Sequence, residues 1–237
     1  MFQPASIKMC TLTYLPTSTG FILTHNRDEL SSRPTSNSIV DEHGIHFPKD
    51  LKAGGTWFAA HKTKGVACIL NGGSKTYTRK NEYRQSRGLI PLHYFNFQDV
   101  DAFLKGYDFS DIEPFTLICA RHDSLSVLVH NEFDTYLEKV NKHTPQIWAS
   151  TTLYTQVART KREKWFANWL EKHPDPQESD ILNFHQKAGD GDPENDMIMS
   201  RWGMLSTSSI TQISFQKSGF QFYFHNLISG KKDLLKK

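Results

Sequence analysis

The pattern that most constrains the fold of this chain is a set of four paired β-like runs, each pair joined by a short turn. Two apolar or β-branched runs that flank a polar or glycine-containing turn are typical of a β-hairpin. The four predicted hairpins join 10–15 to 21–25, 56–60 to 65–70, 115–120 to 125–130, and 210–215 to 220–225. Because a tight turn can connect only antiparallel neighbours, the pattern predicts an antiparallel β core.

Helices are predicted in three places. The clearest spans 156–173, where apolar and aromatic side chains recur at helical spacing opposite a charged face. We expect this aromatic stripe to pack on the core rather than to bind a cofactor. Weaker helical patterns cover 99–104 and 179–187. Strands interleaved with a few helices predict an α+β fold.

The length of 237 residues suits one large domain or two small ones. We predict a single domain over 10–228, with a leader or mis-assigned start at 1–9. Residues 229–237 form a basic tail that we expect to be frayed and solvated. A formal net charge of +3 does not indicate nucleic acid, and no apolar run approaches the ~20 residues of a membrane helix.

The three cysteines are widely spaced and form no CxxC motif. A disulfide framework or a zinc ribbon is therefore not expected, and a reducing, cytoplasmic location is predicted. Cys68 and Cys119 lie in apolar runs and are interpreted as small buried hydrophobes. The histidines include no HExxH motif, so no metal site is predicted.

Cys10 is the strongest candidate for a nucleophile. It directly follows Met9, so a start at Met9, or removal of residues 1–9, would make Cys10 the N-terminal residue. A thiol and a free amine on one Cα supply a nucleophile and its base. With the Met9–Cys10 peptide bond intact, the amine is an amide and this base does not exist.

Charged residues follow in the second strand of the first hairpin. Counting back from a turn at 16–20 pairs Cys10 with Asn26 and places Asp28 diagonally beside it. Arg27 would then face the other side, although a slip of one residue would exchange these roles. A nearby cation lowers a thiol pKa, and a carboxylate can hold an amine. The alternative is a solvated turn with an internal ion pair.

Asn71 ends an apolar strand and precedes Gly72 and Gly73. Its side-chain amide could donate to a developing oxyanion beside a flexible backbone. The alternative is an ordinary Asn-Gly turn.

A basic stretch with two interleaved tyrosines follows this strand. Its cations are Lys75, Arg79, Lys80, Arg84 and Arg87. They could contact a phosphate, as in coenzyme A, or form a solvated basic loop; nucleic acid is not predicted as a partner.

Several of these motifs together resemble the NRDE family, also called the transport and Golgi organisation family, in its bacterial form. The opening Met9-Cys10-Thr-Leu-Thr-Tyr14 and the later Asn26-Arg27-Asp28-Glu29 carry the resemblance most strongly. Similar segments include Gly54-Gly-Thr-Trp57, Leu70-Asn71-Gly72, Tyr83-Arg84-Gln-Ser86-Arg87-Gly88 and Trp148-Ala-Ser-Thr-Thr-Leu-Tyr154. The resemblance covers roughly residues 9 to 215.

That family in turn resembles N-terminal-nucleophile (Ntn) hydrolases with cysteine, such as the choloylglycine hydrolases. The resemblance implies a four-layer αββα sandwich of two antiparallel sheets. It also implies Cys10 as the nucleophile, Arg27 and Asp28 beside it, and Asn71 as an oxyanion donor. The residues expected at the substrate are Asn26, Trp57, Gly72, Arg84, Arg87 and Thr151, the last at a position where relatives often have Asn.

The function expected on these grounds is that of an N-terminal-cysteine hydrolase or acyltransferase. Its substrate would be a small-molecule amide with a non-peptide C–N bond, or a related ester, and no cofactor is expected. One alternative is a non-catalytic carrier for haem or an acylated ligand such as acyl-CoA on the same scaffold. Another is a purely structural interaction module.

Overall fold

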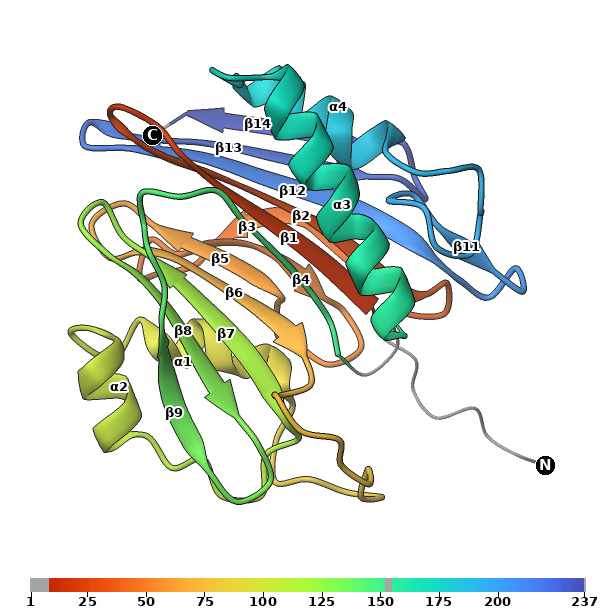
Figure 1. Ribbon diagram of the computed structural model, residues 1–237. Helices are drawn as coiled ribbons and strands as arrows, with labels where there is room; N and C mark the ends of the chain where they lie inside the picture. Colours follow the sequence, from red (N-terminus) through yellow and green to blue (C-terminus); the bar gives the residue numbers. More distant parts are fainter. Residues whose placement is uncertain (1–8, 152–154, 237) are drawn as a thin grey trace. The chain divides into compact units, whose positions relative to one another are not determined.

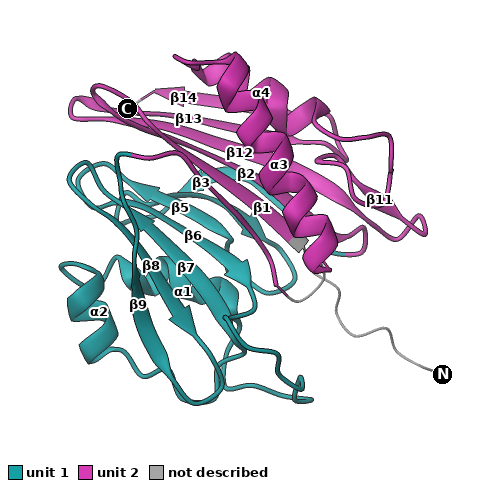
Figure 2. Cartoon of the chain, in the orientation of Figure 1, with its two compact units in different colours: residues 1–5, 33–143, 237 teal, residues 6–32, 144–236 magenta. Residues whose placement is uncertain are grey.

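A computed structural model describes residues 9–151 and 155–236 of this chain. They fall into two compact units, one of residues 33–143 and one of the described residues in 9–32 and 144–236 (Figure 2). Each unit contains an antiparallel sheet and helices, which confirms the predicted α+β class. The expected single domain over 10–228 stays a prediction.

The unit that contains Cys10 has a sheet whose long strands lie under two helices (Figure 1). In spatial order the strands are β10 (Gln146–Ala149), β1 (Met9–Pro16), β2 (Gly20–Leu30), β12 (Leu205–Gln216), β13 (Gly219–Asn226) and β14 (Lys232–Lys236), with β11 (Ser200–Arg201) paired to β12. The helices α3 (Gln156–Lys172) and α4 (Glu178–Lys187) cover one face of this sheet.

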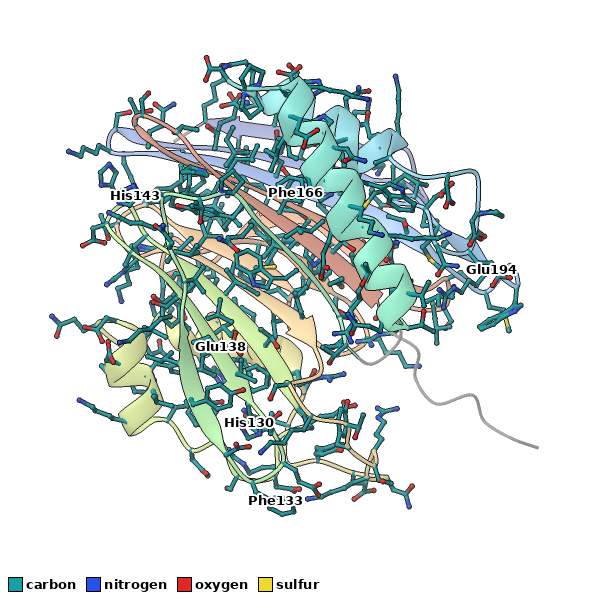
Figure 3. The ribbon with its side chains drawn as sticks, in the orientation of Figure 1. His130, Phe133, Glu138, His143, Phe166 and Glu194 are labelled. Atoms are coloured by element: carbon teal, nitrogen blue, oxygen red, sulfur yellow. The ribbon has the colours of Figure 1, made fainter. Side chains whose placement is uncertain are left out.

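Apolar side chains join these helices to the sheet. Phe166 of α3, labelled in Figure 3, packs with Phe184 of α4 and with Leu15 and Ile22 of the first hairpin. All four side chains are buried because they face one another across the helix–sheet interface. Among the predicted stripe of α3, Val157 is an exception and is exposed.

The other unit contains a seven-stranded meander and three short helices. Its strands run in chain order: β3 (Thr35–Val40), β4 (His46–Asp50), β5 (Phe58–His61), β6 (Gly65–Asn71), β7 (Phe115–Ala120), β8 (Leu125–His130) and β9 (Thr135–Lys139). Between β6 and β7 lie the 3-10 turn η1 (Arg87–Leu89), α1 (Ile90–Tyr94) and α2 (Val100–Gly106). Asp99 caps α2 by accepting a hydrogen bond from the Ala102 N–H. Phe133, labelled in Figure 3 at the turn between β8 and β9, is exposed.

The predicted hairpins and helices are confirmed. The hairpins are β1–β2, β5–β6, β7–β8 and β12–β13, and the helices are α2, α3 and α4. Among the described residues, Cys68 and Cys119 are buried and form no disulfide, as expected of small core residues.

The expectation of a frayed tail is wrong. Residues 232–236 form β14, which pairs with β13 from Gln221 to His225. The physical reason is that β13 would otherwise end the sheet and leave one side of its backbone without strand partners. Alternate side chains of β14 remain exposed, in keeping with an edge strand.

Candidate active site

The register of the first hairpin places Cys10 opposite Arg27, Thr11 opposite Asn26 and Met9 opposite Asp28. The predicted pairing of Cys10 with Asn26 is therefore wrong by one residue. The reason is that β1 continues through Pro16, which pairs with Phe21, so the turn is shorter than expected. Because directly opposed residues share a face of the sheet, Cys10 and Arg27 point to the same side.

The Arg27 guanidinium is held on two sides. Its Nη2 lies 3.3 Å from Glu29 Oε2, and its Nη1 donates to Ser208 Oγ at 3.2 Å. Ser208 Oγ in turn donates to the Arg27 carbonyl at 3.0 Å. A register shift between Thr207 and Ser209 brings Ser208 to this position. Bulges of this kind re-aim side chains next to functional sites.

Asp28 is also buried and firmly bonded. Its Oδ1 accepts a hydrogen bond from Thr207 Oγ1 at 2.6 Å, and Thr207 Oγ1 accepts one from the Met199 N–H at 2.9 Å. Asp28 pairs with Met9, the residue that precedes Cys10. A negative charge is thus fixed at the end of β1 where a freed Cys10 amine would lie.

Cys10 itself is 5% exposed. Burial, and after it the charge of Asp28, raise the pKa of its thiol to about 12, although Arg27 and the Asp28 backbone N–H act to lower it. Burial outweighs the cation, so the thiol is protonated at neutral pH while Met9 is attached.

We expect Cys10 to resist alkylation in the chain that keeps residues 1–9. At pH 7.5 its rate with iodoacetamide should be at least ~100-fold below that of an exposed cysteine, and it should still rise at pH 9, because only the thiolate reacts. Peptide mapping of the Cys10 peptide measures the rate, with the urea-unfolded chain as the reference. A plateau below pH 9 would contradict the buried, protonated thiol.

Asn26 lies on the helix face of the sheet, away from Cys10. Its Nδ2 donates to the carbonyls of His185 (2.9 Å) and Met197 (2.7 Å), and its Oδ1 lies 2.8 Å from His185 Nδ1. His185 Nε2 lies 2.8 Å from Thr13 Oγ1. The expected contact of Asn26 with a substrate is corrected: these bonds fix α4 and the following loop to the sheet.

Two buried histidines predict acid sensitivity. Burial and then Arg27 lower the pKa of His25 to about 3, and burial, His25 and Arg162 lower that of His185 well below 6.5. Both are neutral when folded but gain protons when unfolded below pH 6.5. Their stabilisation is thus complete above that pH and is lost as the pH falls from 6.5 toward 3, by about 1.4 kcal/mol per pH unit for each group.

Urea unfolding at pH 7.5 and pH 5.0 tests this expectation. His185→Gln should reduce the loss of unfolding free energy between the two pH values by about 2 kcal/mol, which is the contribution of one histidine between pH 6.5 and pH 5.0. The surface variant His143→Gln serves as a control and should leave the loss unchanged. If the unfolding free energy of His185→Gln depended on pH as strongly as that of the parent, the role of His185 in acid sensitivity would be contradicted.

Three other candidate site residues lie outside the unit that contains Cys10. Trp57, Asn71 and Gly72 belong to the unit of residues 33–143, and their roles stay predictions. Asn71 is half-buried at the end of β6, and Gly72 has a φ of 87°, which suits the turn that follows. Cys10, Arg27 and Asp28, in contrast, all lie in the first hairpin of the other unit.

The basic stretch is paired with carboxylates of its own unit. The ion pairs are Lys75–Asp134, Arg79–Glu113, Lys80–Asp111, Arg84–Asp108 and Arg87–Glu113, at 3.1 to 3.3 Å. Arg87 is buried and also donates to the Pro114 carbonyl. This pairing argues against the expected substrate contacts of Arg84 and Arg87, because their charges already have partners.

Two serines near Cys10 were missed by sequence reasoning. The Ser150 N–H donates to the Cys10 carbonyl at 3.0 Å, and Ser150 is buried, whereas Thr151, the expected contact, is exposed. Ser208 holds Arg27 through the bulge. Residues 206–209 have no local sequence signal that would indicate a bulge beside Arg27.

Within residues 9–151 and 155–236, no group of three or more His, Cys, Asp or Glu side chains is placed to hold a metal ion. In the same ranges, no helix has both the length and the apolar character needed to cross a bilayer.

Comparison with solved structures defines the class of fold. The Caenorhabditis elegans N-acylethanolamine-hydrolyzing acid amidase ortholog matches with a TM-score of 0.57 and 12% sequence identity, over 89% of this chain and 98% of that chain. The predicted Ntn-hydrolase-like fold class is thereby confirmed. The Transport and Golgi organisation 2 family matches residues 9–217, and the chain belongs to this family. No curated protein sequence matches at a significant level.

Proposed function

We propose that this protein is an N-terminal-cysteine hydrolase or acyltransferase that acts on a small-molecule amide or a related ester. The observation that carries the proposal is the position of Cys10 directly opposite Arg27, whose guanidinium Glu29 and Ser208 hold in place. A fixed cation beside a thiol favours the thiolate. The catalyst is complete only when Cys10 has a free amine.

The reaction would proceed through an acyl-enzyme. The Cys10 thiol attacks the substrate carbonyl and forms an S–C bond while the Cys10 amine accepts the thiol proton. The amine then gives this proton to the leaving nitrogen, and the C–N bond breaks. Water, or another acceptor in the acyltransferase case, adds to the thioester, the S–C bond breaks, and the thiol is regenerated. Asn71 as an oxyanion donor stays an expectation from the sequence.

The similar solved structure supports amide chemistry. That protein is an ortholog of an N-acylethanolamine-hydrolyzing acid amidase, and N-acylethanolamines are small-molecule amides. At 12% identity we take from it the bond type and not the substrate. Three cysteines that form no disulfide within the described residues also support the proposal of a cytoplasmic location.

The test uses protein that begins at Cys10. It is incubated with a panel of acyl thioesters and small-molecule amides, and intact mass reports a covalent acyl adduct, which peptide mapping assigns to Cys10. Cys10→Ala should form none, and Cys119→Ala, which changes another buried cysteine, should form it normally. Turnover that Cys10→Ala leaves unchanged would refute the proposal.

A further inference from the structure

One cross-strand row on the Cys10 side of the sheet is entirely polar. Arg27 lies opposite Cys10 on one side and opposite Ser209 on the other. Ser209 lies opposite Asn226, and on the far side of Cys10 the Ser150 N–H bonds to the Cys10 carbonyl. Opposed residues share a face, so the five side chains line one strip of the sheet, from the end of β10 to β13.

Two hydroxyls of this row make no hydrogen bond within the described residues. Ser150 Oγ and Ser209 Oγ are buried and find no hydrogen-bond partner among the described residues, and the same holds for Thr211 Oγ1, two residues along β12. A buried hydroxyl left unbonded destabilises the fold, so such groups are rare unless a ligand or water satisfies them.

The hydroxyls on the helix face of the same sheet behave differently. Thr11 Oγ1 accepts from Arg162, Thr13 Oγ1 bonds His185, and Thr24 Oγ1 accepts from Gln212. These three buried threonine hydroxyls are used by the fold, whereas Ser150 Oγ, Ser209 Oγ and Thr211 Oγ1 on the Cys10 side are not. The contrast indicates that the Cys10 side holds polar groups for a partner that the chain itself does not supply.

The spacing of the row sets what could bind there. Neighbouring strands lie about 4.8 Å apart, so Ser209 is about 10 Å from Cys10, with Arg27 between them. An acyl group attached to Cys10 and extended along the row passes Arg27 and meets Ser209 about five bonds from its carbonyl carbon. A plain hydrocarbon chain would leave the Ser209 hydroxyl unsatisfied.

We propose, on the basis of the proposed acyl-transfer function, that Ser209 selects acyl groups carrying a hydrogen-bonding oxygen about five bonds from the reacting carbonyl. Ser150, on the other side of Cys10, faces the leaving-group half of the substrate. The row is buried while Met9 prolongs β1 beside it. Release of residues 1–9, which the proposed function requires, ends β1 at the row itself.

The test compares two fluorogenic amides of 7-amino-4-methylcoumarin of nearly the same shape. One carries a 5-oxohexanoyl group, with a carbonyl oxygen five bonds from the reacting carbon, and the other a 5-methylhexanoyl group. Protein that begins at Cys10 should cleave the oxo amide with a kcat/KM at least ~10-fold higher, because a site built to hydrogen-bond rejects an analogue without the group. Ser209→Ala should bring the ratio close to one, and Ser209→Thr should keep it.

The ratio is measured within one preparation, so partial misfolding of a variant does not change it. Ser214→Ala is the matched control: it removes a buried serine of the same strand that pairs with Ile22 on the helix face, and it should leave the ratio unchanged. A ratio near one in the parent, with Cys10 acylated by both amides, overturns the role of Ser209 and leaves the proposed function standing. Acylation by neither these amides nor the thioester panel refutes the proposed function and the inference with it.

Discussion

A chain that begins at Cys10 is expected to be acylated by the acetyl thioester of N-acetylcysteamine at least ~1000-fold faster than the chain that keeps residues 1–9. In the longer chain burial raises the pKa of the Cys10 thiol to about 12, so almost no thiolate exists at pH 7.5. In the shorter chain an amine with a pKa near ~8 adjoins the thiol, accepts its proton and contributes a second cation beside it. Intact mass over time measures the adduct at equal protein concentrations.

Two control variants test whether the faster acylation depends on the Cys10 thiol and on the Arg27 cation. Cys10→Ser in the shorter chain tests whether the thiol itself is required, and it should lower the acylation rate by at least ~100-fold because a serine hydroxyl is a far weaker nucleophile. Arg27→Met in the shorter chain should lower the rate and raise the pH at which it reaches half its maximum, because the cation opposite Cys10 is removed. Equal rates for the two chain lengths would show that the free amine is not the base.

Arg162→Met is expected to destabilise the protein by about 3–5 kcal/mol, because it leaves several buried acceptors without their donor and each costs about 1–3 kcal/mol. Arg162 lies in α3 and is fully buried. It donates to the carbonyls of Asn195 (3.1 Å) and Asp196 (2.7 Å) and to Thr11 Oγ1 on β1. Methionine fills much of the same volume but leaves these acceptors buried without the donor.

Urea unfolding followed by far-UV circular dichroism measures this loss. The matched control is Lys164→Met, which removes a cation from an exposed position of the same helix and should change the unfolding free energy by less than about 0.5 kcal/mol. A loss below 1 kcal/mol for Arg162→Met would mean that the loop carbonyls find other donors. In that case the buried arginine is not what ties the 188–197 loop to the sheet.

The elements that sequence reasoning found are those whose pairing is local. Each predicted hairpin joins strands separated by a short turn, so alternation and turn residues on either side carry enough information. The strands β3 and β9 were missed because they are mostly polar and partly exposed, and β4 is short and contains Pro48. Such segments become strands because a neighbouring edge offers backbone partners.

The residues of the candidate site also fall into those that local sequence identified and those that only the structure revealed. Cys10, Arg27 and Asp28 were found because they lie in one hairpin and in recognisable motifs. Ser208 and Ser209 were not, because β12 reaches β2 from about 180 residues away in the chain. The carboxylate partners of the basic stretch could not be found from the sequence for the same reason, since they lie between residues 108 and 134.

The sequence by itself determined the antiparallel hairpins, the three main helices, the family and the candidate nucleophile, because these depend on local periodicity and on short motifs. Only the tertiary structure decided that Cys10 faces Arg27 rather than Asn26, since one residue in the length of a turn moves every side chain of a strand to the other face. It alone also brought the bulge of β12 against Arg27 and placed the unbonded hydroxyls of Ser150 and Ser209 on either side of the pair. Such juxtapositions arise from pairing between distant segments, which no local pattern records.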